Sequence, residues 1–259
     1  MVASLMQLEL HERGNHVVSP GGRGHRAGAR ETESDDGAES DDGAESACTG
    51  CAWGRWGKMA VMTSDAETVA LLERALDQTA GLVAAIEPGQ AELATPCAGW
   101  DVRTLVSHLA GRDLRNFLVS ARGETPDWTA PDEEIGDDWA AAFRDRAVPL
   151  RMAWRAADLD RLVAGPGGEA PLRARADQQI TELAVHDWDL ARATGQALAG
   201  LDPALAEHAL TWSHGMLRPE FRGPDKAFGV EVPVPDDAPV YDRLAGWFGR
   251  DPGWERASR

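Results

Sequence analysis

From residue 64 onward, hydrophobic residues recur at the three- and four-residue spacing that one buried face of a helix requires. Ser64 and Glu67 form a capping-box pattern, which marks the start of a helix that we expect to extend towards Pro88. A second helix should begin at Asp101, because this residue type suits an N-cap and apolar residues follow it at helical spacing. This part of the chain is therefore predicted to be helical.

Two more long helices and several short elements are expected further along. A third helix over about 137–162 contains Pro149, which should kink or split it. A fourth helix over about 171–194 is followed by Gly195, a suitable C-terminal cap. Shorter elements follow, namely helices at about 202–217 and 238–249 and an extended segment at 230–235 that is at most an edge strand. Four long helices with short additions predict an all-α helical bundle.

Residues 1–61 have a different composition from the rest. Gly-rich, basic sequence leads into an acidic tract that contains DDGAES twice, at 35–40 and 41–46. Such a segment buries too little apolar surface to offset its chain entropy, so we interpret 1–61 as a disordered leader and 62–259 as the helical domain. We hypothesise that translation begins near Met62 and that the leader is a mis-assigned start. Mass spectrometry of the native N-terminus tests this, and native peptides from 1–58 would refute it.

Composition and charge narrow the classes of function. Hydrophobic residues make up 43% of the chain and charged residues 27%, which suits a globular protein that buries a core. The net charge of −17 and the pI of about 4.8 argue against binding of a nucleic-acid backbone, which requires clustered Lys and Arg. No apolar run approaches the roughly 20 residues of a membrane-spanning helix, and we find no secretory signal pattern. We expect a cytoplasmic protein without membrane or nucleic-acid partners.

The fourth predicted helix carries Glu182 and His186, four residues apart. Residues at this spacing lie on one side of a helix, and a carboxylate and an imidazole are both common ligands of zinc-class ions. The pair points away from the helix's apolar arc, together with Gln179 and Asp189, so a site here should face a polar cavity between helices. The alternative interpretation is a solvated surface pair.

His108 is the third candidate, at the edge of the apolar face of the second helix. A lone histidine there is also typical of a partly buried structural residue, and spacing alone does not show whether it meets Glu182 and His186. Cys97, in the loop before this helix, is either a buried small residue or a thiol near the metal. Cys48 and Cys51 form a CxxC motif without the βαβ context of a redox site, so we expect no function there.

Three motifs in order resemble those of the mycothiol-dependent maleylpyruvate isomerase-like proteins, a DinB-like family. The first is Thr95-Pro96-Cys97-Ala98-Gly99-Trp100-Asp101, continued to His108, and the second is the run from Glu182 through His186 and Trp188 to Gly195. The third comprises Phe228-Gly229, the Pro-rich stretch 232–239 and Gly249-Arg250-Asp251-Pro252, and is similar to a subgroup of unassigned metal-binding proteins. The resemblance implies a four-helix up-down-down-up bundle with a short C-terminal helical extension. It also implies a metal held by His108, Glu182 and His186.

The resemblance further implies chemistry with a low-molecular-weight thiol. A divalent metal, zinc by donor type, would have three protein ligands and an open position, as in catalytic sites. A thiol such as mycothiol would be activated there as a thiolate for transfer to, or isomerisation of, an electrophilic small molecule. The tail after Gly195 is shorter than the separate C-terminal domain of the isomerase, so the resemblance does not extend to maleylpyruvate as the substrate. The alternatives are a metal-dependent hydrolase, a non-catalytic metal-binding or sensor module, and a structural helical protein.

Further residues are candidates for supporting roles. Arg222, with Arg218 nearby, could clamp an anionic substrate or thiol carboxylate as a catalytic residue, the alternative being a solvated loop arginine. Asp187 or Asp189 could hold a ligand histidine through its second ring nitrogen, the alternative being ordinary surface charges. Trp100 and Trp188 could wall the site. The sequence leaves the oligomeric state open, with a homodimer as one option.

Overall fold

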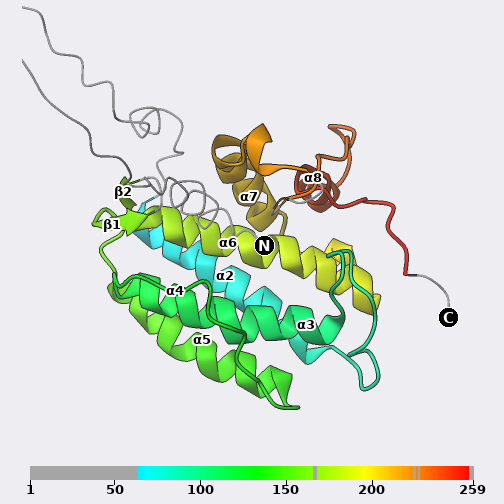
Figure 1. The fold of residues 1–259 in the computed structure, drawn as a ribbon, viewed down its shortest axis with the longest axis horizontal. Coiled ribbons are helices and arrows are strands. Elements are labelled where there is room, and N and C mark those ends of the chain that lie inside the picture. The colour runs from blue at the N-terminus through cyan, green and yellow to red at the C-terminus, as the bar shows by residue number, and fades with distance from the viewer. Residues whose placement is uncertain (1–63, 166–167, 224–225, 227, 257–259) are drawn as a thin grey trace, which may run out of the picture.

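The computed structural model describes residues 64–165, 168–223, 226 and 228–256, so the leader 1–61 lies outside the described residues. Helices dominate this part of the chain (Figure 1), and the all-α class is confirmed. The helical elements are α2 (Asp65–Ala84), α3 (Val102–Ser107), the π-helical η3 (His108–Asp113), α4 (Leu114–Ala121), α5 (Trp139–Ala156), α6 (Arg173–Thr194), η4 (Leu198–Gly200), α7 (Pro203–Met216), η5 (Pro219–Phe221) and α8 (Val240–Trp247). The strands are β1 (Leu162–Gly165) and β2 (Gly168–Pro171), paired antiparallel.

Four helical segments surround the main core. The segment α2 packs against α5 and α6, and α4 packs against the same two helices from the other side. Arg173 at the start of α6 pairs with Asp65 at the start of α2, and Gln196 just after α6 bonds to Leu82 near the end of α2, so these two helices run in the same direction. The α3–η3–α4 segment and α5 run in the opposite direction, as the colour gradient in Figure 1 shows.

The helix boundaries follow from local capping. Ser64 accepts a hydrogen bond from the backbone of Glu67, whose side chain accepts one in return, so the capping box predicted for α2 is confirmed. Asp101 accepts from the backbone of Thr104 and starts α3, as predicted. Gly195 caps α6 in the left-handed conformation with φ of 77°, which a residue with a Cβ adopts only at a cost. Boundaries set by adjacent residues are therefore where the sequence is most informative.

The predicted third helix is wrong at its C-terminal end. The helix α5 ends at Ala156 instead of continuing to residue 162, and β1 begins there. Leu159 continues the apolar pattern, but it is buried from a turn, whereas Leu162 is 57% exposed in β1. Pro149 does not split the helix: α5 is continuous across it.

The helix α6 is buried almost all around. The bundle covers one side of it, while α7 and α8 pack against the rest, above the bundle in Figure 1. The sequence pattern predicted that the polar side of α6 faces a polar cavity. On that side, the residues are almost completely buried, each with 0–1% exposure: Gln179, Glu182, His186 and Asp189. The C-terminal helices thus turn what looked like the outer side of α6 into an interior.

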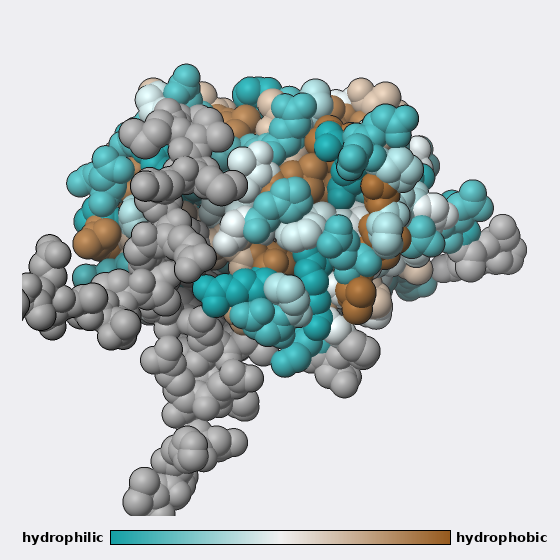
Figure 2. All heavy atoms as spheres, turned by 90° about the horizontal axis from the view of Figure 1, so that it is seen from above, coloured by the Kyte–Doolittle hydropathy of each residue, from teal (hydrophilic) through white to brown (hydrophobic). Residues whose placement is uncertain are grey.

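Most charged groups of the described chain remain on the outside. The view from the side of α7 and α8 shows hydrophilic residues interspersed with small hydrophobic patches (Figure 2). In the described ranges, no helix combines the length and apolarity that crossing a membrane would require. The polar residues of α6 differ from these surface residues, because they are buried.

The π-helical segment η3 is held against the loop that precedes α5. Gly111 in η3 is buried, and a Cβ at this position would lie 2.7 Å from the carbonyl oxygen of Glu133 and 3.1 Å from its nitrogen. Arg112 reaches the same loop through Asp132 at 2.6 Å, and Arg115 through Glu133 at 3.3 Å. The glycine therefore permits a close backbone approach that fixes η3 on the bundle.

We predict that Gly111→Ala lowers the free energy of unfolding by about 1–3 kcal/mol, because the methyl group must displace backbone atoms of Glu133. Gly81→Ala is the matched control: Gly81 lies exposed within α2 with nothing near its virtual Cβ, so alanine should be neutral or stabilising by about 0.5–1 kcal/mol. Denaturant unfolding of both variants measures the difference. A Gly111→Ala protein as stable as the parent would show that the contact is not tight.

Candidate metal centre

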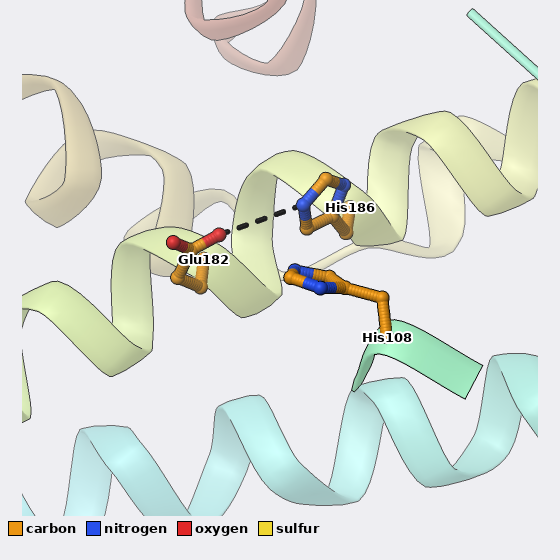
Figure 3. Close-up of side chains that lie close together, drawn as sticks. All are labelled: His108, Glu182 and His186. Carbon is orange, nitrogen blue, oxygen red and sulfur yellow. Dashed lines mark ion pairs between the residues drawn. The ribbon is translucent and has the colours of Figure 1, made fainter. Parts of the chain in front are cut away.

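Three side chains from two segments of the bundle meet inside the protein. His108 comes from the start of η3, and Glu182 and His186 come from α6 (Figure 3). One ligand-type atom from each lies within 4.8 Å of the others, and the three residues are 0–1% exposed. The structure thus brings together the three residues that the sequence singled out.

The helix α6 supplies two of these side chains from consecutive turns. Because residues four apart are neighbours on a helix, the Oε2 atom of Glu182 and the Nε2 atom of His186 come to 3.5 Å. Figure 3 marks this ion pair and shows the His108 ring next to it, on a neighbouring segment. The His108 and His186 ring centroids are 5.3 Å apart, with the ring planes at 79°.

The π-helical turn places an acidic partner beside His108. In an α-helix, residues five apart point in directions that differ by about 140°. A π-helix instead bonds residues five apart and brings them to one side. His108 and Asp113 span this turn, and the Nε2 atom of His108 lies 3.2 Å from Oδ2 of the buried Asp113, an ion-pair distance without full hydrogen-bond geometry. The Nδ1 atom of His108 is left without a hydrogen-bond partner.

His186 has an acidic partner of its own. Its Nδ1 atom lies 2.9 Å from Oδ2 of Asp189, one turn further along α6, which leaves Nε2 facing Glu182. Asp189 also accepts two hydrogen bonds from Arg250, which follows α8 near the end of the described chain. Each imidazole therefore has one nitrogen beside a buried aspartate and the other without a hydrogen-bond partner, an arrangement typical of histidines that ligate metals.

Trp100 closes one side of the cluster. Thr95 donates its backbone N–H to the Trp100 carbonyl oxygen, and Gly99 has φ of 80°, so the segment before α3 is a tight turn. This turn places the Trp100 ring 4.8 Å from the His108 ring and 6.1 Å from the His186 ring, between centroids. The first sequence motif thus acts by presenting Trp100 to both imidazoles.

Two neighbouring carboxyls on α6 have opposite electrostatic environments. Burial raises the pKa of both, but in Asp189 the charge of Arg250 and the hydrogen bonds from His186 and Arg250 outweigh it and lower the pKa to about 2. In Asp187 burial dominates over hydrogen bonds from Gln78 and Thr79 and raises the pKa to about 7. Asp189 is thus held as a carboxylate beside His186, whereas Asp187 joins α6 to α2.

The donor set fits a cation. In these three side chains, five buried atoms lack a hydrogen-bond partner, namely both ring nitrogens of His108, both carboxylate oxygens of Glu182 and Nε2 of His186. Leaving a buried polar group unpaired costs about 1–3 kcal/mol. Two imidazoles and a carboxylate are ordinary ligands of zinc-class ions. A cation among them could bind one ring nitrogen of each histidine and the Glu182 carboxylate.

Other candidate residues lie elsewhere. Arg222 stacks on the Trp247 ring at 4.2 Å and donates to the Trp247 carbonyl oxygen at 2.5 Å, and within the described residues no hydrogen bond or ion pair joins it to the three clustered side chains. Its catalytic role stays a prediction. Arg218 pairs with Glu220 at 3.6 Å. Trp188 donates to Asp242 of α8 and has no ring contact with either histidine among those described.

Cys97 is the one cysteine within the described residues. It is 1% exposed, and burial raises the pKa of its thiol to about 11. Cys97 is thus a buried residue, and because the charges of Asp189 and Arg250 also affect its pKa, the interpretation as a thiol near the metal stays a prediction. Cys48 and Cys51 lie outside the described residues.

Sequence reasoning missed two residues of the cluster. Asp113 could not be recognised in the sequence, because it lies five residues after His108 and residues five apart do not share a face of an α-helix. Arg250 did carry a signal, since it belongs to the third sequence motif, but periodicity assigns it no partner. Its contact with Asp189 depends on how the C-terminal segment folds back.

Comparison with known proteins identifies the family of the chain. The family model described as the mycothiol maleylpyruvate isomerase N-terminal domain matches residues 72–191, which include His108, Glu182 and His186. Two curated relatives are the uncharacterized proteins MT0763 and Rv0738 of Mycobacterium tuberculosis, strains CDC 1551 / Oshkosh and ATCC 25618 / H37Rv. Each is 33% identical over 178 residues, which cover 69% of this chain and 94% of the relative.

Two solved structures are also similar. The crystal structure of the mycothiol-dependent maleylpyruvate isomerase matches with a TM-score of 0.47 and 16% identity, over 56% of this chain and 68% of that one. A histidine-to-alanine mutant of the isomerase matches with a TM-score of 0.46 and 15% identity, over the same shares. At this distance the family assignment depends on the sequence comparisons.

Proposed function

Because the chain belongs to the family of the mycothiol maleylpyruvate isomerase N-terminal domain, we propose that it is a divalent-metal-dependent enzyme acting with a low-molecular-weight thiol. The observation that carries this proposal is the buried cluster of His108, Glu182 and His186, whose ligand atoms lack hydrogen-bond partners. These three residues hold the metal, and zinc is the ion that suits the donor set best. The thiol is mycothiol, by analogy with the family.

A bound dication would supply an open coordination position and would favour the thiolate form of a thiol that reaches it. The chain's own residues prepare this position. Glu182 contributes a negative charge and the two histidines neutral nitrogens, each ring being oriented by Asp113 or Asp189. Trp100 covers the rings and excludes water from that side. The proposed reaction is transfer of the thiol to, or isomerisation of, an electrophilic small molecule.

The metal content of the purified protein tests the first half of this proposal. We predict about one zinc-class ion per chain, as expected for a three-ligand site, and loss of that ion in His186→Ala because a ligand is removed. His208→Ala is the matched control: His208 of α7 pairs with Asp177 of α6 and is not part of the cluster, so this variant should keep its metal. Elemental analysis after gentle purification gives the ratio. Metal-free protein that also fails to take up zinc, cobalt or manganese would contradict the proposal.

The thiol half has a separate spectroscopic test. Adding mycothiol to the Co²⁺-loaded protein should produce a near-ultraviolet sulfur-to-cobalt band, because the open position admits the thiolate. The oxidised disulfide form of mycothiol is the control and should give no band, since it offers no thiol. A metal-loaded protein that shows neither the band nor calorimetric binding of mycothiol is not a thiol-dependent enzyme. Hydrolysis without added thiol would instead favour a hydrolase, and metal binding without either would favour a sensor module.

A further inference from the structure

The C-terminal segment directs Arg250 into the protein, onto a carboxylate that contacts the cluster. Arg250 donates its Nε–H to Oδ1 of Asp189 at 3.2 Å and an Nη2–H to Oδ2 at 2.8 Å. A third N–H, from Nη1, goes to the carbonyl oxygen of Phe248. The side chains of Arg250 and Asp189 are 4% and 0% exposed. This is a two-pronged guanidinium–carboxylate pair in the interior, the geometry that arginine provides and lysine does not.

The chain path to Arg250 is specified by two glycines. Gly249 follows α8 with φ of 79°, and its backbone N–H bonds back to Gly246 at 2.9 Å. A Cβ on Gly249 would lie 2.7 Å from the Cα atom of Gly229, so the two backbones touch. The third sequence motif contains both glycines and Arg250. The motif therefore builds a turn that directs Arg250 inward.

Asp189 is shared between Arg250 and a proposed metal ligand. Its Oδ2 atom lies 2.9 Å from Nδ1 of His186 and 2.8 Å from Nη2 of Arg250. The two hydrogen bonds from Arg250 fix the plane of the carboxylate, and the carboxylate in turn fixes which nitrogen of His186 faces Glu182. Arg250 is thus connected to the ligand ring through one intervening group.

The balance of buried charges also favours a cation in the cluster together with Arg250 beside Asp189. Three buried carboxylates, Asp113, Glu182 and Asp189, surround the two imidazoles. When ionised they carry three negative charges, which a dication and the Arg250 guanidinium balance. Buried charges are tolerated when they are paired and hydrogen-bonded.

We propose that Arg250 is a positioning residue of the metal centre: it acts through Asp189 on His186, so that metal binding and docking of the C-terminal segment 248–250 are thermodynamically coupled. This inference rests on the metal site proposed above. Coupling of this kind is reciprocal, so a segment that strengthens metal binding when docked is itself stabilised by the metal.

Zinc titration of the full-length protein against a chromophoric chelator tests the first half. We expect the zinc Kd to rise roughly 10–100-fold in Arg250→Met, as is typical when the partner of a ligand histidine is perturbed. Arg250→Lys keeps the charge but lacks the two-pronged geometry, so it should also bind more weakly. The matched control is Arg151→Met: Arg151 joins α5 to α2 through Asp77 and the Glu73 carbonyl oxygen, and no hydrogen bond or ion pair within the described residues joins it to Asp189 or the C-terminal segment. Its Kd should stay within about twofold of the parent.

A double-mutant cycle separates a positioning role from a general effect on the fold. If Arg250 acts through Asp189, Arg250→Met should change the Kd by less than about twofold once Asp189→Asn is present. Effects of the two substitutions that multiply would overturn the inference. So would unchanged affinity in both Arg250 variants, or an equal loss in Arg151→Met.

Hydrogen exchange on the unmodified protein tests the reciprocal half and does not depend on any variant folding. Zinc should slow exchange of the backbone amides of Phe248, Gly249 and Arg250, while the strands β1 and β2 serve as the reference and should not change. Equal exchange at 248–250 with and without bound zinc would overturn the coupling. A parent protein that binds no zinc, cobalt or manganese would overturn the proposed function as well. If zinc binds but its Kd does not change when Arg250 is substituted, only this inference is overturned.

Discussion

Burial of charge is the constraint on which this structure depends. Two imidazoles and three carboxylates are packed between the helical segments with almost no exposure to water. Such groups are costly to bury unless each finds a partner of opposite charge or a hydrogen bond. Arg250 partners Asp189, but the ligand atoms of His108, Glu182 and His186 have no hydrogen-bond partner within the described chain. A cation at that point would make the arrangement stable, which is why we regard the cluster as a metal centre.

The fold serves this cluster from several directions. The helix α6 is the central element: it supplies Glu182, His186 and Asp189, and α7 and α8 cover the side that the bundle leaves open. The π-helical turn of η3 supplies His108 together with Asp113, and the close approach permitted by Gly111 holds that turn in place. The C-terminal segment is therefore part of the site's construction and not a separate appendage.

Local chemistry made part of this structure predictable. The capping box at Ser64, the N-cap at Asp101 and the left-handed Gly195 each depend on adjacent residues, and all three are confirmed. That His108 lies next to Glu182 and His186 was predicted only from the family resemblance, because spacing along the sequence does not show which faces of distant helices converge. Long-range packing explains the failures: α5 ends early where Leu159 is buried from a turn, and Asp113 joins His108 only because the helix widens into a π turn. The inward path of Arg250 likewise depends on contacts between Gly229 and Gly249.

The most direct test of the account is X-ray absorption spectroscopy of the zinc-loaded protein in the absence of thiol. The account predicts nitrogen and oxygen ligands at roughly 2.0–2.2 Å with the scattering pattern of two imidazoles. It also predicts that His108→Ala reduces this pattern to one imidazole. A first shell that contains protein sulfur, or one without imidazole, would contradict the assignment of the buried cluster as the metal centre.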